Sequence, residues 1–88
     1  MREIFLSPGT EVRGTIIGIE EIGDVVRIHI SFDAVKVEIK IPISLLQTNI
    51  DDIGQLIGGK VSILRTESRY FLISSKRHRR VKKEGDIQ

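Results

Sequence analysis

Residues 76–83 form the most cationic segment of this chain, and six of these eight positions hold Lys or Arg. Such a run suits phosphate chemistry, because each cation that neutralises a phosphate releases condensed counterions. Residues 1–75 hold 8 Lys and Arg against 10 Asp and Glu, whereas residues 76–88 hold 6 against 2. We therefore predict a slightly acidic body and a basic tail, 76–88, that is disordered on its own and contacts RNA or DNA. A solubilising terminus is the alternative.

A second group of cations falls on one face of a predicted hairpin, residues 25–41. Alternation places Arg27, Lys36 and Lys40 on its outward face, with Arg27 directly opposite Lys40. Like charges opposite each other destabilise a sheet, so a bound phosphate would relieve this repulsion. Neutralisation by Glu38, diagonal to Arg27, and by Glu residues elsewhere is the alternative. The predicted nucleic-acid-binding residues are therefore Arg27, Lys36, Lys40, Lys76, Arg77, Arg79, Arg80, Lys82 and Lys83.

Neither of the two motifs that resemble catalytic machinery has the surroundings that its chemistry needs. Residues 54–60 fit G-x-x-x-x-G-K, but Val61 stands where magnesium coordination needs Ser or Thr, and a strand is expected next instead of a helix. Asp51 and Asp52 are adjacent on a predicted helix, where acids compensate the charge of the N-terminus. We predict a protein that is not an enzyme and has no cofactor and no metal.

The hairpin itself is predicted from the strictest alternation in the chain. A two-residue loop, Asp33-Ala34, would pair every inward residue with an apolar partner. It lacks the glycine that such turns favour, so a slightly longer loop is the alternative. His29 then faces Glu38 as a surface pair of small energetic value. The predicted inward pairs are Phe32–Val35, Ile30–Val37, Ile28–Ile39 and Val26–Ile41. Because the aromatic of this hairpin, Phe32, points inward, base stacking on the outward face is not expected.

The remaining pattern predicts three more strands and one helical connection. Residues 12–19 form the first strand, interrupted by Gly14 and Gly18, which indicate a bulge or a sharp bend. A helical connection follows Pro42, with a helix starting at Asn49. Residues 60–64 and 70–74 then form a closing hairpin. The order predicts an all-β protein, a five-stranded OB-like barrel spanning residues 1–75, with the helical connection between the third and fourth strands.

The amino-acid composition limits the kind of protein and its expected cellular location. The chain has 88 residues and no cysteine, so a disulfide framework is excluded. No apolar run has the length of a membrane span, and the first residues lack a signal-peptide profile, so we expect a cytoplasmic protein without a membrane partner. The high charge and the absence of cysteine favour a thermophilic source.

Two families share features with this sequence. Residues 12–73 resemble a TOBE domain, the small barrel of ATPase subunits in solute importers, through Gly14, Ile19-Glu20, Gly23-Asp24, Ile41-Pro42 and Gly59-Lys60-Val61. This resemblance implies an OB-like barrel that binds small oxyanions or acts on a partner protein. The opening and closing strands are also similar to those of S1-type RNA-binding barrels, through Gly9, Val12, Gly14, Ile16 and Ile19 and through residues 68–77.

Two functions follow from these features. The first is a non-catalytic, nucleic-acid-associated protein that contacts phosphates through the basic tail and the outward hairpin face. The alternative is a TOBE-like regulatory or oxyanion-binding module that acts with a protein partner or by self-association.

Overall fold

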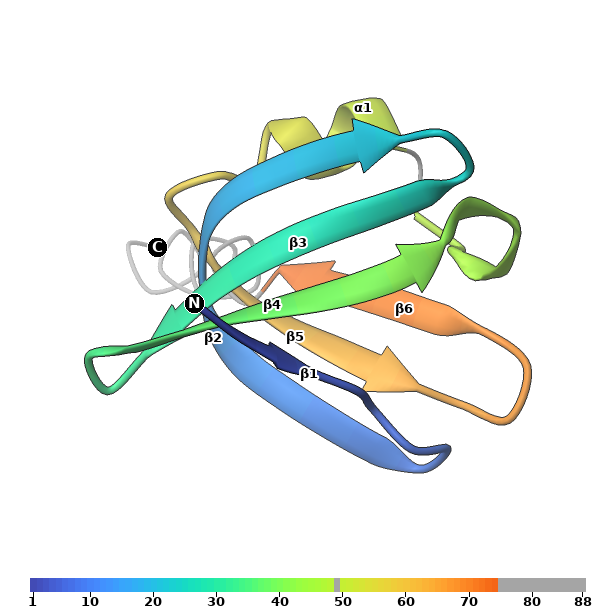
Figure 1. Ribbon diagram of the computed structural model, residues 1–88, viewed down its shortest axis with the longest axis horizontal. Helices are drawn as coiled ribbons and strands as arrows, with labels where there is room; N and C mark the ends of the chain where they lie inside the picture. Colours follow the sequence, from blue (N-terminus) through green and yellow to red (C-terminus); the bar gives the residue numbers. More distant parts are fainter. Residues whose placement is uncertain (49, 75–88) are drawn as a thin grey trace, which may run out of the picture.

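The computed structural model describes residues 1–48 and 50–74, and its centre is the hairpin of β3 (Val25–Phe32) and β4 (Val35–Pro42) (Figure 1). Alternation along these strands puts β-branched residues on the inner face, where they pack against one another. The observed register pairs the predicted partners, Phe32 with Val35, Ile30 with Val37, Ile28 with Ile39 and Val26 with Ile41. Six of these eight residues are at most 2% exposed, and the exceptions are Phe32 and Val35 beside the turn.

The turn between these strands has two residues although it contains no glycine. Asp33 has φ 49° and Ala34 has φ 66°, so both lie in the left-handed region. A two-residue hairpin turn that matches the twist of its strands needs positive φ at both positions. Aspartate tolerates this conformation, whereas for alanine it costs free energy. The longer loop that the missing glycine suggested is therefore not formed.

β2 (Thr10–Ile22) is longer than the predicted strand because it pairs with two different strands. Its first half, up to Thr15, pairs with β5 (Lys60–Arg65), and its second half, from Thr15 onward, pairs with β3. The ladder with β3 continues to the pair of Ile22 and Val25, which leaves only two residues for the turn. β2 therefore connects the two halves of the sheet.

Both glycines within β2 have a structural reason. The register between β2 and β3 shifts between Ile16 and Gly18, which confirms the predicted irregularity. At Gly14, a Cβ atom would lie 2.5 Å from Cγ2 of Ile30 and 2.8 Å from the carbonyl oxygen of Ser31. Only glycine therefore allows β2 to approach β3 this closely.

The strands form one sheet in the order β1-β4-β3-β2-β5-β6, where β1 is Arg2–Ile4 and β6 is Tyr70–Ser74. The all-β class is confirmed, but the sheet has six strands instead of five. β1 was not predicted, because three residues are too few to show an alternating pattern; it pairs in parallel with β4. No ladder joins β1 to β6 among the described residues, so the sheet is open and not the five-stranded OB-like barrel that was predicted.

The predicted helical connection lies between β4 and β5 and consists of two short pieces, η1 (Ile43–Leu45) and α1 (Ile50–Gly54). The residues between these pieces cover the outer edge of β6. Leu46 forms a parallel bridge with Tyr70, and the N–H of Gln47 donates to the Tyr70 carbonyl at 2.9 Å. The hydroxyl of Thr48 accepts from the N–H of Leu72 at 3.3 Å and donates to its carbonyl at 3.5 Å. Asn49, the predicted helix start, lies outside the described residues.

The core lies on the inner face of the curved sheet and is closed by α1. Ile53 of α1 is fully buried, as are Ile16 of β2 and Ile63 of β5. Within the described residues no charged side chain is buried, whereas Tyr70 of β6 belongs to the core. None of the helices in the described ranges is both long enough and apolar enough to span a membrane.

Candidate nucleic-acid interface

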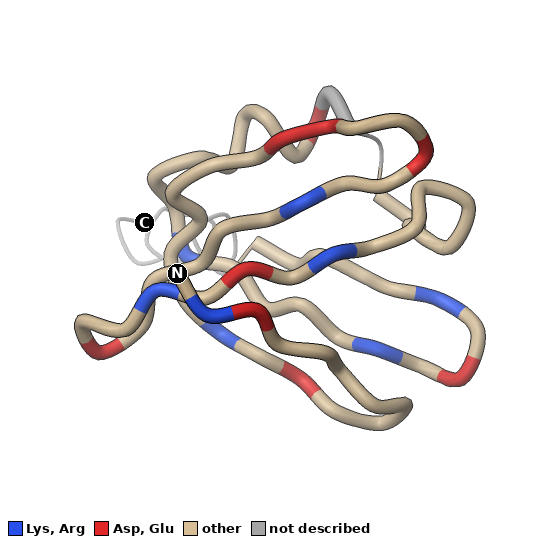
Figure 2. Tube along the Cα trace, viewed as in Figure 1, with Lys and Arg blue, Asp and Glu red and all other residues tan. Residues whose placement is uncertain are grey.

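Arg27 and Lys40 lie directly opposite each other, as predicted, but protein carboxylates already surround them. Arg27 contacts Glu20 on β2 at 3.4 Å and Glu38 on β4 at 3.6 Å, and Lys40 contacts Glu3 on β1 at 3.3 Å. Figure 2 shows the resulting alternation of acidic and basic segments from strand to strand. Neutralisation by carboxylates of the protein, the alternative to a bound phosphate, is therefore observed for this pair of cations.

His29 and Glu38 also form the predicted pair, at 3.4 Å. The Glu38 carboxylate lies between the imidazole and the guanidinium of Arg27, and its side chain is 18% exposed. Across the part of the chain that the structure describes, no group of three or more His, Cys, Asp or Glu side chains could hold a metal ion. His29 and Arg27 share the Glu38 carboxylate on the outer face of the hairpin.

Lys36 differs from the other two predicted cations, because within residues 1–48 and 50–74 it has no ion-pair partner. It belongs to a row of polar residues that crosses four strands on the outer face. Lys60 lies opposite Thr15, Thr15 opposite Ser31, and Ser31 opposite Lys36. Three strand spacings separate the two lysine backbones by about 14 Å. The row has a cation at each end and two hydroxyl groups between them, a combination that suits phosphate oxygens.

A groove opens beside this row, where β2 changes partners. Thr15 is the only residue of β2 that pairs with both β3 and β5. The residues of β2 that precede Thr15 pair with β5 and no longer with β3. The groove has a volume of about 710 Å³, within the range of small-molecule sites. Its polar lining consists of Arg13, Thr15, Ser31, Asp33, Lys60 and Ser62.

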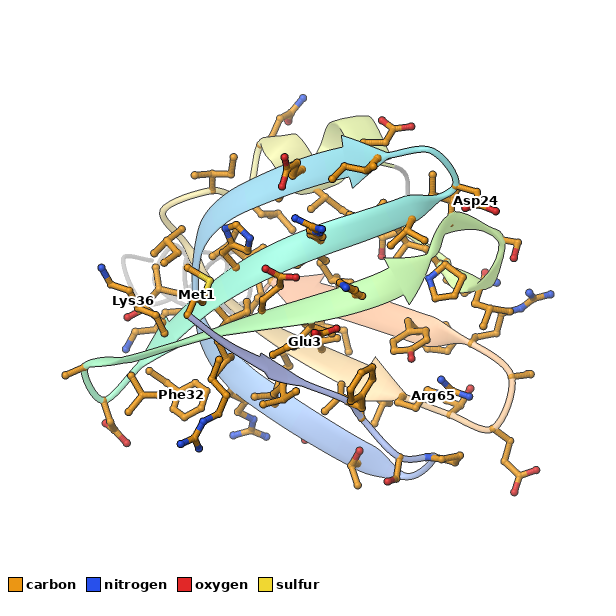
Figure 3. All side chains as sticks on the ribbon, viewed as in Figure 1. Met1, Glu3, Asp24, Phe32, Lys36 and Arg65 are labelled. Carbon is orange, nitrogen blue, oxygen red and sulfur yellow. The ribbon has the colours of Figure 1, made fainter. Side chains whose placement is uncertain are left out.

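Phe32 also lines this groove, although it was expected to point only into the core. It is half-buried and packs against the core. Figure 3 shows Phe32 near the β3–β4 turn, on the opposite side of the hairpin from Lys36. The inward prediction is therefore correct for the face, but β2 and β3 no longer pair beyond Ser31, and the ring also lines the groove.

The wall of the groove on β2 carries a charged pair at the surface. Nε of Arg13 donates to Glu11 at 3.2 Å. The hydrogen bond from Arg13, together with one from Ser62, holds the pKa of the Glu11 carboxyl below its ordinary value. The side chain of Arg13 is 77% exposed, so solvent screens this pair strongly. Arg13 can therefore exchange Glu11 for an external anion at small cost.

Six of the predicted nucleic-acid-binding residues, Lys76, Arg77, Arg79, Arg80, Lys82 and Lys83, lie outside the described residues. Ser74, the last residue of β6 and of the described part of the chain, lies opposite Val61, which lines the groove. β6 therefore ends beside the groove.

The G-x-x-x-x-G-K segment has the wrong order of elements for a phosphate-binding loop. Gly54 ends α1 and Lys60 begins β5, so a helix precedes the loop and a strand follows it. Gly58 has φ 91°, which only glycine adopts readily, so it serves the turn into β5. Asp52 is exposed. These features agree with the structural interpretation of this segment.

Among the residues of the row and the groove that were not identified from the sequence, four lie on β2 and β5, namely Arg13, Thr15, Lys60 and Ser62. They come together through the pairing of β2 with β5, which are far apart in the chain. Each is an ordinary polar position in an alternating strand, so no local signal distinguishes it. A predicted register between these two strands would have placed Arg13 opposite Ser62 and Thr15 opposite Lys60.

No family model, no curated protein and no solved structure matched this chain in comparisons with known proteins.

Proposed function

We propose that this protein is a non-catalytic, nucleic-acid-associated protein that binds phosphate groups through the basic tail and the polar row on its outer face. The observation that carries the proposal is the row itself. Lys36 and Lys60 lie at the ends of a line of hydroxyl groups across four paired strands. Contacts to phosphates position a protein on nucleic acid and carry little sequence information.

An OB-like arrangement is consistent with this function. β2 pairs with a strand of the β3–β4 hairpin on one side and with a strand of the β5–β6 hairpin on the other. The parallel bridge of Leu46 with Tyr70 places the segment that follows β4 against β6. A strand shared in this way curves one sheet around a single core. Small barrels of the OB type bind single-stranded nucleic acid on their strands.

The predicted cations contribute unequally in this proposal. Arg27 and Lys40 have carboxylate partners, so a phosphate that binds them competes with Glu20, Glu38 and Glu3. Among the nine predicted nucleic-acid-binding residues, we expect Lys36 and the six cations of residues 76–83 to contribute most to phosphate binding. Lys60 on β5 adds a cation to the row by its position opposite Thr15.

Salt-dependent binding tests the proposal. Fluorescently labelled single-stranded and double-stranded RNA and DNA are titrated with the full chain over a range of salt concentrations, and anisotropy is measured. The logarithm of the affinity for a single strand falls with the logarithm of salt by about 0.7 for each phosphate neutralised. Replacement of the six tail cations by Gln should reduce this slope by up to about 4, because the tail provides six of these contacts.

A matched pair of variants tests the row. Lys36→Ala with Lys60→Ala should reduce the slope by about 1.4, since two phosphate contacts are lost. Arg69→Ala removes a cation from the turn between β5 and β6, at the far end of this hairpin from Lys60, and should leave the slope unchanged. If the full chain binds none of the four nucleic acids at low salt, the proposal is wrong.

A second candidate function, a regulatory module that binds a partner protein, is favoured by one specific observation. Phe71 and Ile73 on the outer face of β6 are 36% and 53% exposed, and Leu64 lies opposite Phe71 on β5. Exposed apolar side chains in adjacent positions are typical of interaction surfaces. Sedimentation of the wild type and of Phe71→Ser with Ile73→Ser tests self-association through this surface. A thermal-shift screen with molybdate, tungstate, sulfate and phosphate tests the oxyanion version of the same candidate.

A further inference from the structure

The groove beside the polar row differs in chemistry from one end to the other. Arg13 and Lys60 provide cations on the side of β2 and β5. Asp33 provides a carboxylate at the β3–β4 turn, and Phe32 provides an aromatic side chain next to it. A simple anion site would not place a carboxylate in its lining, because like charges repel. The groove therefore suits a ligand with an anionic part and a separate ring part.

A nucleotide has this composition. Its phosphate carries the negative charge that Arg13 and Lys60 attract, and its sugar offers hydroxyl and ether oxygens to Thr15 and Ser62. Its base has a flat face that stacks on an aromatic ring and an edge with N–H donors that a carboxylate accepts. Phe32 and Asp33 both line the groove, so the ring and the acceptor are available to the same ligand.

We propose that this groove receives one unstacked nucleotide of a single-stranded nucleic acid, with its phosphate at Arg13 and Lys60 and its base at Phe32 and Asp33. This inference rests on the proposed nucleic-acid function and adds a preference for single strands to it. A base in a duplex is stacked and paired, and its extrusion costs a few kcal/mol. A single strand avoids most of this cost.

Tryptophan fluorescence provides a direct readout, because the chain contains no tryptophan. Phe32→Trp places one indole in the groove, and a base that stacks on it quenches its emission. Phe71→Trp places the indole on the outer face of β6 as the matched control. Each variant is kept as the full chain, and circular dichroism establishes that it is folded.

Three ligands are compared by anisotropy and fluorescence together: a single-stranded oligonucleotide, the same sequence as a duplex, and inorganic phosphate alone. We expect the single strand to quench the emission of Phe32→Trp and not that of Phe71→Trp, and the duplex to bind with little quenching. In a chain without the tryptophan, Phe32→Leu should weaken single-strand binding by about 5- to 150-fold, the usual range for loss of one base stack. Phe71→Leu should leave the affinity unchanged.

The outcomes separate this inference from the proposed function. If anisotropy detects binding but the emission of Phe32→Trp is not quenched, or if the duplex quenches it equally, the groove inference is overturned and the proposed function stays in place. Quenching of Phe32→Trp by inorganic phosphate to the same extent also overturns it, because the site would then recognise a free anion. Absence of binding to every nucleic acid overturns both.

Discussion

Replacement of Gly14 by alanine tests the close approach of β2 to β3. The added methyl group would lie 2.5 Å from Cγ2 of Ile30 and 2.8 Å from the Ser31 carbonyl oxygen. Ile30 is fully buried and the Ser31 carbonyl belongs to the backbone, so neither atom can move away without disturbing its neighbours. We therefore expect Gly14→Ala to destabilise the fold.

The magnitude follows from two opposing effects. Overpacking of a core position costs about 1–3 kcal/mol. Replacement of glycine by alanine also restricts the unfolded chain, which stabilises the folded state by about 0.4–1 kcal/mol. The net loss at Gly14 is then about 1–2 kcal/mol.

Gly18→Ala is the matched control, since it makes the same chemical change in the same strand. The nearest atom to a Cβ at Gly18 is Nδ1 of His29 at 3.4 Å, which is an ordinary contact. Gly18→Ala should therefore keep or raise stability, by up to about 1 kcal/mol. The difference between the two variants isolates the steric clash.

Urea denaturation followed by circular dichroism measures this difference. With a slope of roughly 1 kcal/mol per molar urea for a small domain, the two midpoints should differ by about 1–3 M. If the midpoint of Gly14→Ala equals or exceeds that of Gly18→Ala, the proximity of the two strands does not require glycine and our explanation is wrong.

Three further predictions concern the core, the turn and the surface. Ile30→Ala should lower the free energy of unfolding by about 2–5 kcal/mol, because it leaves a cavity in the core. Lys40→Ala should change it by less than about 1 kcal/mol, and equal losses for the two variants in urea denaturation would contradict the register of β3 and β4. Ala34→Gly should raise the melting temperature, since glycine adopts the positive φ of this position without strain; a lower melting temperature would argue against the two-residue turn. Glu11 has a lowered pKa in the folded state, so its contribution to stability is present above its unfolded pKa and is lost as pH falls through the folded pKa. The difference in urea midpoint between wild type and Glu11→Gln should therefore vanish in acid, and a difference that persists there would have another origin.

The alternation of apolar and polar residues was sufficient to predict the β3–β4 hairpin. Its inward pairs, from Val26–Ile41 to Phe32–Val35, follow from alternation, because a slip by one residue would turn every apolar side chain outward. The bounds of β6, Tyr70–Ser74, follow from the same kind of pattern. These features depend on residues that are close together in the chain.

Features that depend on distant residues were not predicted. β1 has three residues, and its position beside β4 is decided by pairing that leaves no trace in sequence periodicity. The expected repulsion between Arg27 and Lys40 is relieved in part by Glu3, which only the placement of β1 brings near Lys40. The polar row and the groove were missed for the same reason, because they require the pairing of Thr15 with Lys60.

The position of β2 between β3 and β5 has a consequence for the order in which the protein assembles. The β2–β3 and β3–β4 pairs join consecutive strands, so they can form before β5 and β6 have been made. The other half of β2 has no partner until β5 is available, since Thr10 pairs with Arg65. Pairing between distant segments is slow because a long loop must close first. During synthesis the first residues of β2 therefore stay unpaired until β5 and β6 have been made. The pairing of these two strands then completes the sheet and its groove.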